Sequence, residues 1–202
     1  MPLSRGLRRD THARNVAGHG RDPVLPDQLT YEGWSDPLVL HLCQTMRASD
    51  AAEIYAQRPD TNAFSLYRDL AAIGRNHLWF EIARPATSMT PVALFGVAGV
   101  SPGGAQAHMF GTDALSLSHA RQIADRIKSH VIPAMRDLGL HRVQAFSLAD
   151  YAWAHRFLER SGARFEAPCW SLGGSGQDFA SFVWLRRDLA PLYETEIEET
   201  GT

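Results

Sequence analysis

This sequence has few cysteines, a small net charge and no long apolar run. Only Cys43 and Cys169 occur, far apart and without the C-x-x-C spacing of zinc sites, so a cysteine-based metal site is excluded and a reduced cytosolic setting is favoured. The formal net charge of -2 excludes bulk attraction to nucleic acid or to an anionic membrane. No stretch approaches the roughly 20 apolar residues of a membrane-spanning helix, and the N-terminus lacks the apolar core of a signal peptide.

Apolar residues suffice for one substantial core, since they make up 45% of the 202 residues. We predict three parts: an extended basic N-terminal arm (1-36), one folded domain (37-189) and an acidic C-terminal tail (190-202). The arm is rich in arginine, glycine and proline and has too little apolar periodicity to offset its ordering entropy. It either docks on a partner or on nucleic-acid phosphates, or is an unstructured leader.

Strand-like and helix-like stretches alternate between the two tails. Branched and aromatic apolar runs predict strands at residues 38 to 43, 77 to 83, 92 to 100, 105 to 110, 141 to 146 and 179 to 185, with extended structure also from Phe165. Apolar residues at three- and four-residue spacing predict helices at residues 50 to 56, 62 to 73, 120 to 138 and 150 to 160. Pro133 removes a backbone donor from the third helix, which should therefore bend or split near His130.

One segment late in the chain carries a recognisable pattern. After a predicted strand comes a helix with Ala154, Phe157 and Leu158 on one face, and Gly162 then supplies a left-handed cap. This motif and the order of elements resemble the GNAT N-acetyltransferase fold over about residues 38 to 188. The resemblance implies an α/β domain with a mixed, mostly antiparallel sheet flanked by helices.

The loop that GNAT enzymes use to hold acetyl-CoA is missing. In that family a [QR]-x-x-G-x-[GA] loop precedes the long helix, and its bare amides bind the pyrophosphate. Here only Gly111 remains of that pattern, and Asp113 would place a carboxylate beside the phosphates. We therefore predict that no cofactor binds. If the protein is an enzyme, the resemblance implies acetyl-CoA, with Gly111, Thr112, Ser116 and Ser118 as its candidate ligands; helix capping is the alternative role for both serines.

Two short segments carry a second resemblance. "Phe-Gly-Val" at residues 95 to 97 and "Gly-Thr-Asp" at residues 111 to 113 look like a divergent bacteriophage branch of the fold, similar to the internal virion protein A family of short-tailed phages. This implies a non-catalytic virion or virion-assembly protein, found in the virion or in the host cytoplasm during assembly. Its partners would be other virion structural proteins, reached through the arm and the tail, with weak nucleic-acid contact and a possible homo-oligomer. The alternative is an acetyl-CoA-dependent N-acetyltransferase acting on an unknown amine.

Two side chains are candidate catalytic groups in the enzyme alternative. Tyr151 falls where many members of the resembled family place a tyrosine that protonates the departing thiolate, although simple packing also explains it. Glu81 could act as a general base toward an amine, or it could be an edge or solvent-facing carboxylate. The histidines show no metal spacing on any one element, so no metal site is expected.

Overall fold

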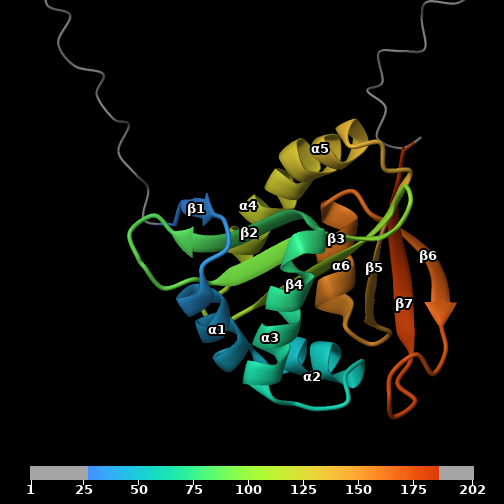
Figure 1. The fold of residues 1–202 in the computed structure, drawn as a ribbon, viewed down its shortest axis with the longest axis horizontal. Coiled ribbons are helices and arrows are strands. Elements are labelled where there is room, and N and C mark those ends of the chain that lie inside the picture. The colour runs from blue at the N-terminus through green and yellow to red at the C-terminus, as the bar shows by residue number, and fades with distance from the viewer. Residues whose placement is uncertain (1–26, 187–202) are drawn as a thin grey trace, which may run out of the picture.

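A seven-stranded sheet organises the computed structural model, which describes residues 27–186 (Figure 1). The spatial order is β1-β2-β3-β4-β5-β7-β6, and every neighbouring pair is antiparallel except β4 with β5. The strands are β1 (Leu29–Glu32), β2 (His77–Pro85), β3 (Ala93–Ser101), β4 (Gly104–Gly111), β5 (Arg142–Leu148), β6 (Arg164–Cys169) and β7 (Phe179–Leu185).

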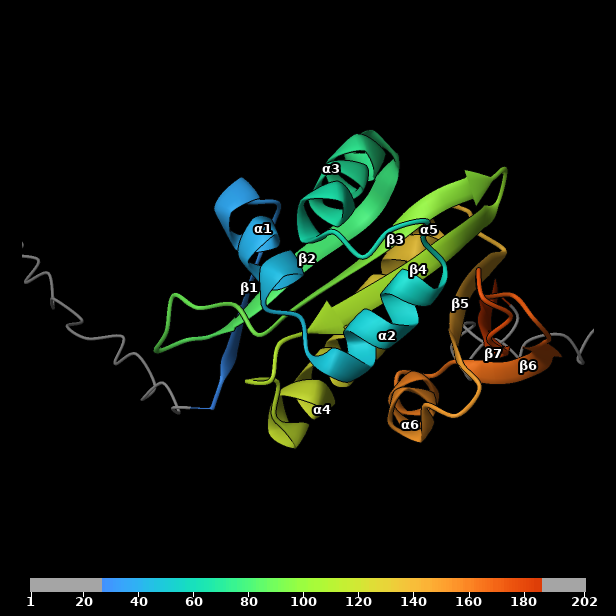
Figure 2. The same cartoon turned by 90° about the horizontal axis from the view of Figure 1, so that it is seen from below.

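Helices cover both faces of this sheet (Figure 2). The first face carries α1 (Asp36–Gln44), α2 (Ala48–Ala56) and α3 (Ala63–Ile73), and the second carries α4 (Leu117–Arg126), α5 (Ile132–Asp137) and α6 (Ala152–Arg160). Each face has its own core, and neighbouring residues of β3 serve different ones, with Leu94 in the first and Phe95 in the second. A strand covered on both faces is apolar at successive positions, which is the pattern that predicted it.

The strand predicted at residues 38 to 43 is wrong, because this segment is helix α1. Ser35 is extended at the N-cap, Asp36 places a negative charge in the first turn, and a proline lies in the first turn, where its missing N–H costs nothing. Val39 and Leu42 are then buried on one face at helical spacing. These start signals outweigh the strand propensity of the branched residues.

Strand β1 lies inside the stretch predicted to be an extended arm. Leu29 is buried, and β1 pairs with β2 from Leu29 opposite Pro85 onward. Gln122 of α4 fastens this strand, since its Oε1 accepts from Leu29 N at 3.0 Å and its Nε2 donates to Asp27 O at 2.7 Å. The rest of the predicted arm, residues 1–26, and the acidic tail lie outside the described residues.

The long second-face helix is interrupted as Pro133 predicts. Between α4 and α5 lies a π-helical turn (Ile127–Val131), in which Ile132 N donates to Ile127 O, five residues back. The other predicted helices and strands are present within a few residues of their expected ends. Within residues 27–186, no helix is long and apolar enough to cross a membrane.

The two parallel strands diverge soon after they meet. Residues 104 to 106 of β4 pair with residues 142 to 144 of β5, and no later pair joins these two strands. Beyond that point the sheet is open, and the candidate site lies in this opening.

Candidate functional site

A cavity of about 160 Å³ passes through the sheet where β4 and β5 diverge. Its first-face lining comes from α2 and includes Asp50 and Glu53. Its second-face lining includes Val131 and Phe157, which belong to the core under α4 to α6. We call this cavity the passage. Because it is lined from both faces, side chains of both faces meet at one point in the sheet.

Helix α2 is fastened across the opening to both strands. On β4, Gly111 N donates to Asp50 Oδ2 at 2.8 Å and Gly111 O accepts from Arg47 N at 2.9 Å. At the end of β5, Glu53 Oε2 accepts from Ser147 Oγ at 2.6 Å and from Leu148 N at 2.9 Å. The hydrogen bonds that a continuous sheet would make between the strand ends are thus replaced by bonds to one helix.

Asp50 is the centre of a polar cluster on the wall of the passage. Its Oδ1 accepts from the Tyr151 hydroxyl at 2.8 Å and lies 2.8 Å from Arg47 Nε. The Arg47 guanidinium carbon is 4.0 Å from the centre of the Trp153 ring, a cation–π arrangement. Tyr151 also shares a hydrogen bond with Ser49 Oγ at 2.8 Å. Burial raises the pKa of Tyr151 to about 12, so its hydroxyl stays protonated near neutral pH.

Glu53 of α2 is a carboxylate in the lining of the passage, and its pKa is raised. Burial raises its pKa, and the hydrogen bonds from Ser147 and Leu148 offset part of that rise. A carboxyl group with a raised pKa is a stronger base when ionised, which suits it to accept a proton from an amine.

Of the two predicted catalytic residues, the structure places one in the passage and one outside it. Tyr151 precedes the first turn of α6 and lines the passage. Glu81 lies on β2, away from the passage, and Arg126 binds both of its oxygens, at 2.7 and 2.5 Å. Glu81 is buried, so its alternative interpretation as a solvent-facing carboxylate is wrong.

Three of the four predicted phosphate ligands, Gly111, Thr112 and Ser116, are engaged by the protein itself. Gly111 gives its N–H to Asp50, and a Cβ at this position would lie 2.7 Å from Leu115 Cδ2, so tight packing explains the glycine. Thr112 Oγ1 accepts from Ala114 N at 3.3 Å within the same loop. The loop therefore holds its own shape with groups that could otherwise meet an anion.

Ser116 is also engaged, and Ser118 is the exception. Ser116 Oγ accepts from His119 N at 3.1 Å while Ser116 N donates to His119 Nδ1 at 3.4 Å, which confirms the capping role. Ser118 lies in the first turn of α4 and is partly exposed. Two carboxylates are near this helix start: Asp113 is exposed in the loop, and Asp27 Oδ1 lies 3.0 Å from His119 Nε2.

Acetyl-CoA therefore fits the site unequally along its length. The edge of β4 at Ala107 and Met109 borders no strand beyond the last β4–β5 pair, and these residues line the passage, so an arm with amide groups can lie there. Thr112 N donates to Val92 O and Leu115 N to Thr112 O, so the backbone N–H groups near the helix start that make no such bond to a described residue are those of Asp113, Leu117 and Ser118. The thioester end has a place, whereas the diphosphate has a reduced one.

The position of α2 on the wall of the passage was not predicted from the sequence. Asp50 and Glu53 were assigned to the start of a helix, where negative charge is favourable on general grounds. Their spacing of three residues places both on one helix face, and that signal could have marked them as a pair. In the described part of the chain, no three His, Cys, Asp or Glu side chains form a group that could hold a metal ion.

Comparison with solved structures decides the fold. A GNAT-family acetyltransferase from Bacillus anthracis is similar with a TM-score of 0.61 at 12% identity, over 81% of this chain and 98% of that one. Ribosomal-protein-alanine N-acetyltransferase from Brucella melitensis gives 0.60 at 11% identity, over 77% and 99%. The chain has the GNAT fold. Spermidine N-acetyltransferase from Vibrio cholerae, in complex with CoA and spermine, gives 0.59 at 13% identity, over 81% and 99%.

These similarities confirm the predicted GNAT-like fold class and leave several finer predictions without support. No known family and no curated protein matches the sequence. The bacteriophage branch and the virion interpretation find no support among these structures, whose own names are those of acetyltransferases. The prediction that no cofactor binds is likewise unsupported; the Vibrio cholerae structure itself contains CoA. Identities this low show the fold and leave the activity to be argued from the site.

Proposed function

We propose that the protein is an acetyl-CoA-dependent N-acetyltransferase acting on an amine. The observation that carries this proposal is the passage through the sheet, which has a perturbed carboxyl group, Glu53, on the first-face side and a free β4 edge beside it. A transfer reaction between two substrates needs both reacting atoms at one point, and a passage lined by residues of both faces supplies such a point.

The donor would lie along the β4 edge. Gly111 presents its N–H and C=O away from β3, and residues two and four positions earlier in a strand present theirs in the same direction. Ala107 and Met109 therefore offer backbone groups to the amides of a pantetheine arm. When bound, acetyl-CoA supplies an acetyl group activated as a thioester. Val131 and Phe157 would exclude water from this point.

Glu53 would act on the acceptor. An amine is mostly an ammonium near neutral pH and must lose a proton before its nitrogen can form an amide bond. The Glu53 carboxylate can accept that proton, and Ser147 Oγ and Leu148 N hold its Oε2 in place. The balanced reaction converts the amine and the thioester into an amide and a free thiol.

Tyr151 would stabilise the departing sulfur. A phenol with a pKa of about 12 is a weaker acid than a thiol, whose pKa is about 8.5. We therefore expect Tyr151, once its single proton turns from Asp50 to the sulfur, to donate a hydrogen bond and not to transfer that proton completely. Asp50 and Ser49 fix the position of its hydroxyl.

Amine-dependent release of thiol from acetyl-CoA tests the proposal. The wild type should release thiol only when an amine is present, and Glu53→Gln should lower kcat by about 100-fold, the size of a lost general base. Glu159→Gln, which changes an exposed carboxylate of α6, serves as the matched control and should retain full activity. Thiol release that does not depend on an amine, or equal kcat values for both variants, would refute the proposed chemistry.

The partners predicted for the two tails stay predictions. Contacts with other proteins or with nucleic acid were assigned to the basic arm and the acidic tail, and residues 1–26 and 187–202 lie outside the described part of the chain. The predicted homo-oligomer also stays open.

A further inference from the structure

A second cavity, of about 320 Å³, adjoins the passage on the first face. We call it the side cavity. It lies between α2, α3 and the neighbouring ends of β3 and β4, and it shares Ile54, Gln106 and His108 with the lining of the passage. The two cavities are therefore neighbours, with these three side chains at their common border.

The side cavity is lined mainly by apolar side chains. These come from both helices and both strands: Ile54, Leu66, Leu70, Ile73, Val100 and Phe110. No carboxylate is among its lining residues, in contrast to the passage with Asp50 and Glu53. The side cavity therefore suits an apolar group and offers no counter-charge to a second ammonium.

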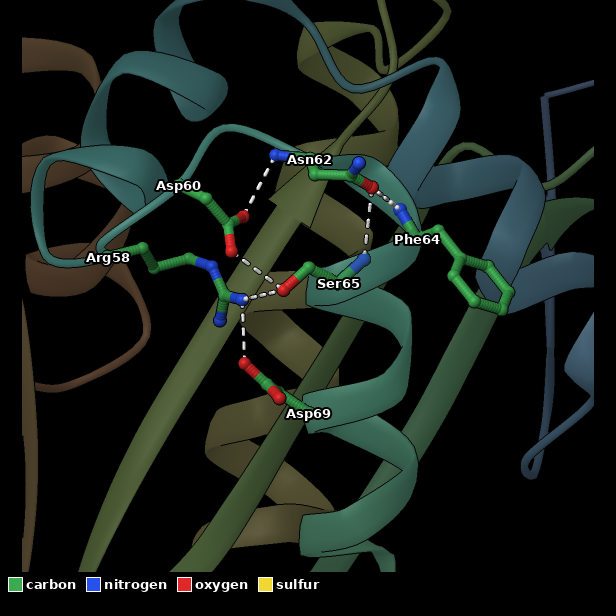
Figure 3. A network of polar contacts seen from close by, with 6 residues as sticks. All are labelled: Arg58, Asp60, Asn62, Phe64, Ser65 and Asp69. Carbon is green, nitrogen blue, oxygen red and sulfur yellow. Dashed lines mark hydrogen bonds and ion pairs between the residues drawn. The ribbon is translucent and has the colours of Figure 1, made fainter.

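The one cation in the lining, Arg58, is neutralised within the protein. Its Nη2 donates to Asp69 Oδ2 at 2.6 Å and to Ser65 Oγ at 3.3 Å (Figure 3). Ser65 in turn donates to Asp60 Oδ2 at 2.9 Å, so two carboxylates surround this guanidinium. Arg58 consequently gives the side cavity no strong preference for an anionic ligand.

His108 supplies a polar atom without a partner at the junction of the two cavities. Its Nε2 is buried and makes no hydrogen bond within the described residues. Burial, with a smaller contribution from His77, lowers the pKa of His108 to about 3, so the ring is neutral. A neutral, buried imidazole adds no charge to the border of the two cavities, which leaves the side cavity suited to an apolar group.

We propose that the acceptor is a primary amine carried on a compact apolar group, such as an aromatic ring on a short chain. The apolar group occupies the side cavity and the amine reaches Glu53 in the passage; this inference rests on the proposed acetyl transfer. A cavity of about 150 Å³ is enough to bind benzene, so about 320 Å³ admits a ring with its linker. The group enters beside Ile73 and Val100, which are 38% and 57% exposed.

Turnover of matched amines tests this inference. 2-Phenylethylamine and ethanolamine are both primary amines on a two-carbon chain and differ in carrying a ring or a hydroxyl group. We expect kcat/KM for 2-phenylethylamine to be at least ten times larger, because the ring is transferred from water to an apolar site. Spermidine, which has no apolar group of this kind and carries several charges, should also be a poor acceptor.

A variant at the mouth links the preference to the side cavity. Ile73→Trp should reduce the ratio of the two kcat/KM values to near one, because the larger side chain obstructs entry. Leu138→Trp makes the same kind of change at an exposed leucine that lines neither cavity, and it should keep the wild-type ratio.

Calorimetric titration with 2-phenylethylamine alone separates this inference from the proposed function. Binding that Ile73→Trp weakens at least tenfold supports the side cavity, even if no acetyl transfer is detected and the proposed function fails. Acetylation of ethanolamine or spermidine as efficient as that of 2-phenylethylamine overturns the inference and leaves the proposed function standing. Absence of both binding and turnover overturns both.

Discussion

Replacing Asp50 by alanine should destabilise the protein far more than replacing a carboxylate in a surface ion pair. Asp50 accepts from Gly111 N and the Tyr151 hydroxyl and pairs with Arg47, and the two charged side chains are only 6% and 14% exposed. Its loss leaves the Arg47 charge buried without a partner, which costs about 3 to 5 kcal/mol. The free energy of unfolding, measured by urea denaturation, should fall by that amount.

Asp69→Ala is the matched control for Asp50→Ala. Asp69 also pairs with an arginine, Arg58, but its side chain is 57% exposed. Exposed ion pairs contribute about 0.2 to 1 kcal/mol, so the free energy of unfolding should change by no more than that. Equal losses in the two variants, or a loss below about 1 kcal/mol for Asp50→Ala, would refute the role of Asp50 in fastening α2 across the opening.

Three further predictions concern titration and catalysis. Because burial raises the pKa of Glu53, folding favours its protonated form. The stability that this preference contributes is complete at low pH and is lost as pH rises through the raised pKa. In urea denaturation, the free energy of unfolding of Glu53→Gln minus that of wild type should therefore be larger near pH 8 than near pH 4. Because burial lowers the pKa of His108 from 6.5 to about 3, the stability contributed by its neutral form is complete above pH 6.5 and is lost as pH falls toward 3. Between pH 6.5 and pH 4.5 the free energy of unfolding of wild type should fall by about 2 to 3 kcal/mol more than that of His108→Gln. Equal losses in the two proteins would count against a neutral ring. Tyr151→Phe should lower kcat by about tenfold or less with little change in KM, because the variant loses a hydrogen bond to the sulfur but no complete proton transfer. A loss of about 1,000-fold would instead show that Tyr151 is a proton donor.

Local signals in the sequence predicted most of the fold. The apolar run of β3 and the helical spacing around Ile123 reflect burial on their own elements, and Pro133 marks the break in the long helix. The segment from 38 to 43 failed because its branched residues also suit a strand, and the deciding start signals lie just before it. Strand β1 was missed because it is short and depends on distant partners, β2 and Gln122.

The site was harder to predict because it depends on contacts between distant segments. Tyr151 could be proposed from its place after β5, but its bond to Asp50 joins residues 101 positions apart. Glu53 meets Ser147 over 94 positions, and its raised pKa comes from burial that no local pattern records. Glu81 had an equally suitable side chain, and only the position of Arg126 shows that it is committed to an ion pair.

The sequence lacks the phosphate-loop pattern of the resembled family, but this lack does not exclude a thioester ligand. The loop amides are engaged by Asp50, Thr112 and Ser116, so the diphosphate has fewer donors than in the loop pattern that the sequence lacks. The opening between β4 and β5 is a separate feature that depends on where the strand pairing ends. A ligand held mainly by its pantetheine arm depends more on this opening than on a phosphate-binding loop.

Calorimetric titration with acetyl-CoA tests the central claim, that the passage between β4 and β5 binds the thioester arm. Wild type should bind with a dissociation constant in the micromolar range, and Ala107→Phe, which places a ring in the passage, should abolish binding. Ala72→Phe, the same change at an exposed position of α3, should bind as wild type does. Equal binding by wild type and Ala107→Phe, or no binding by wild type, would contradict the claim.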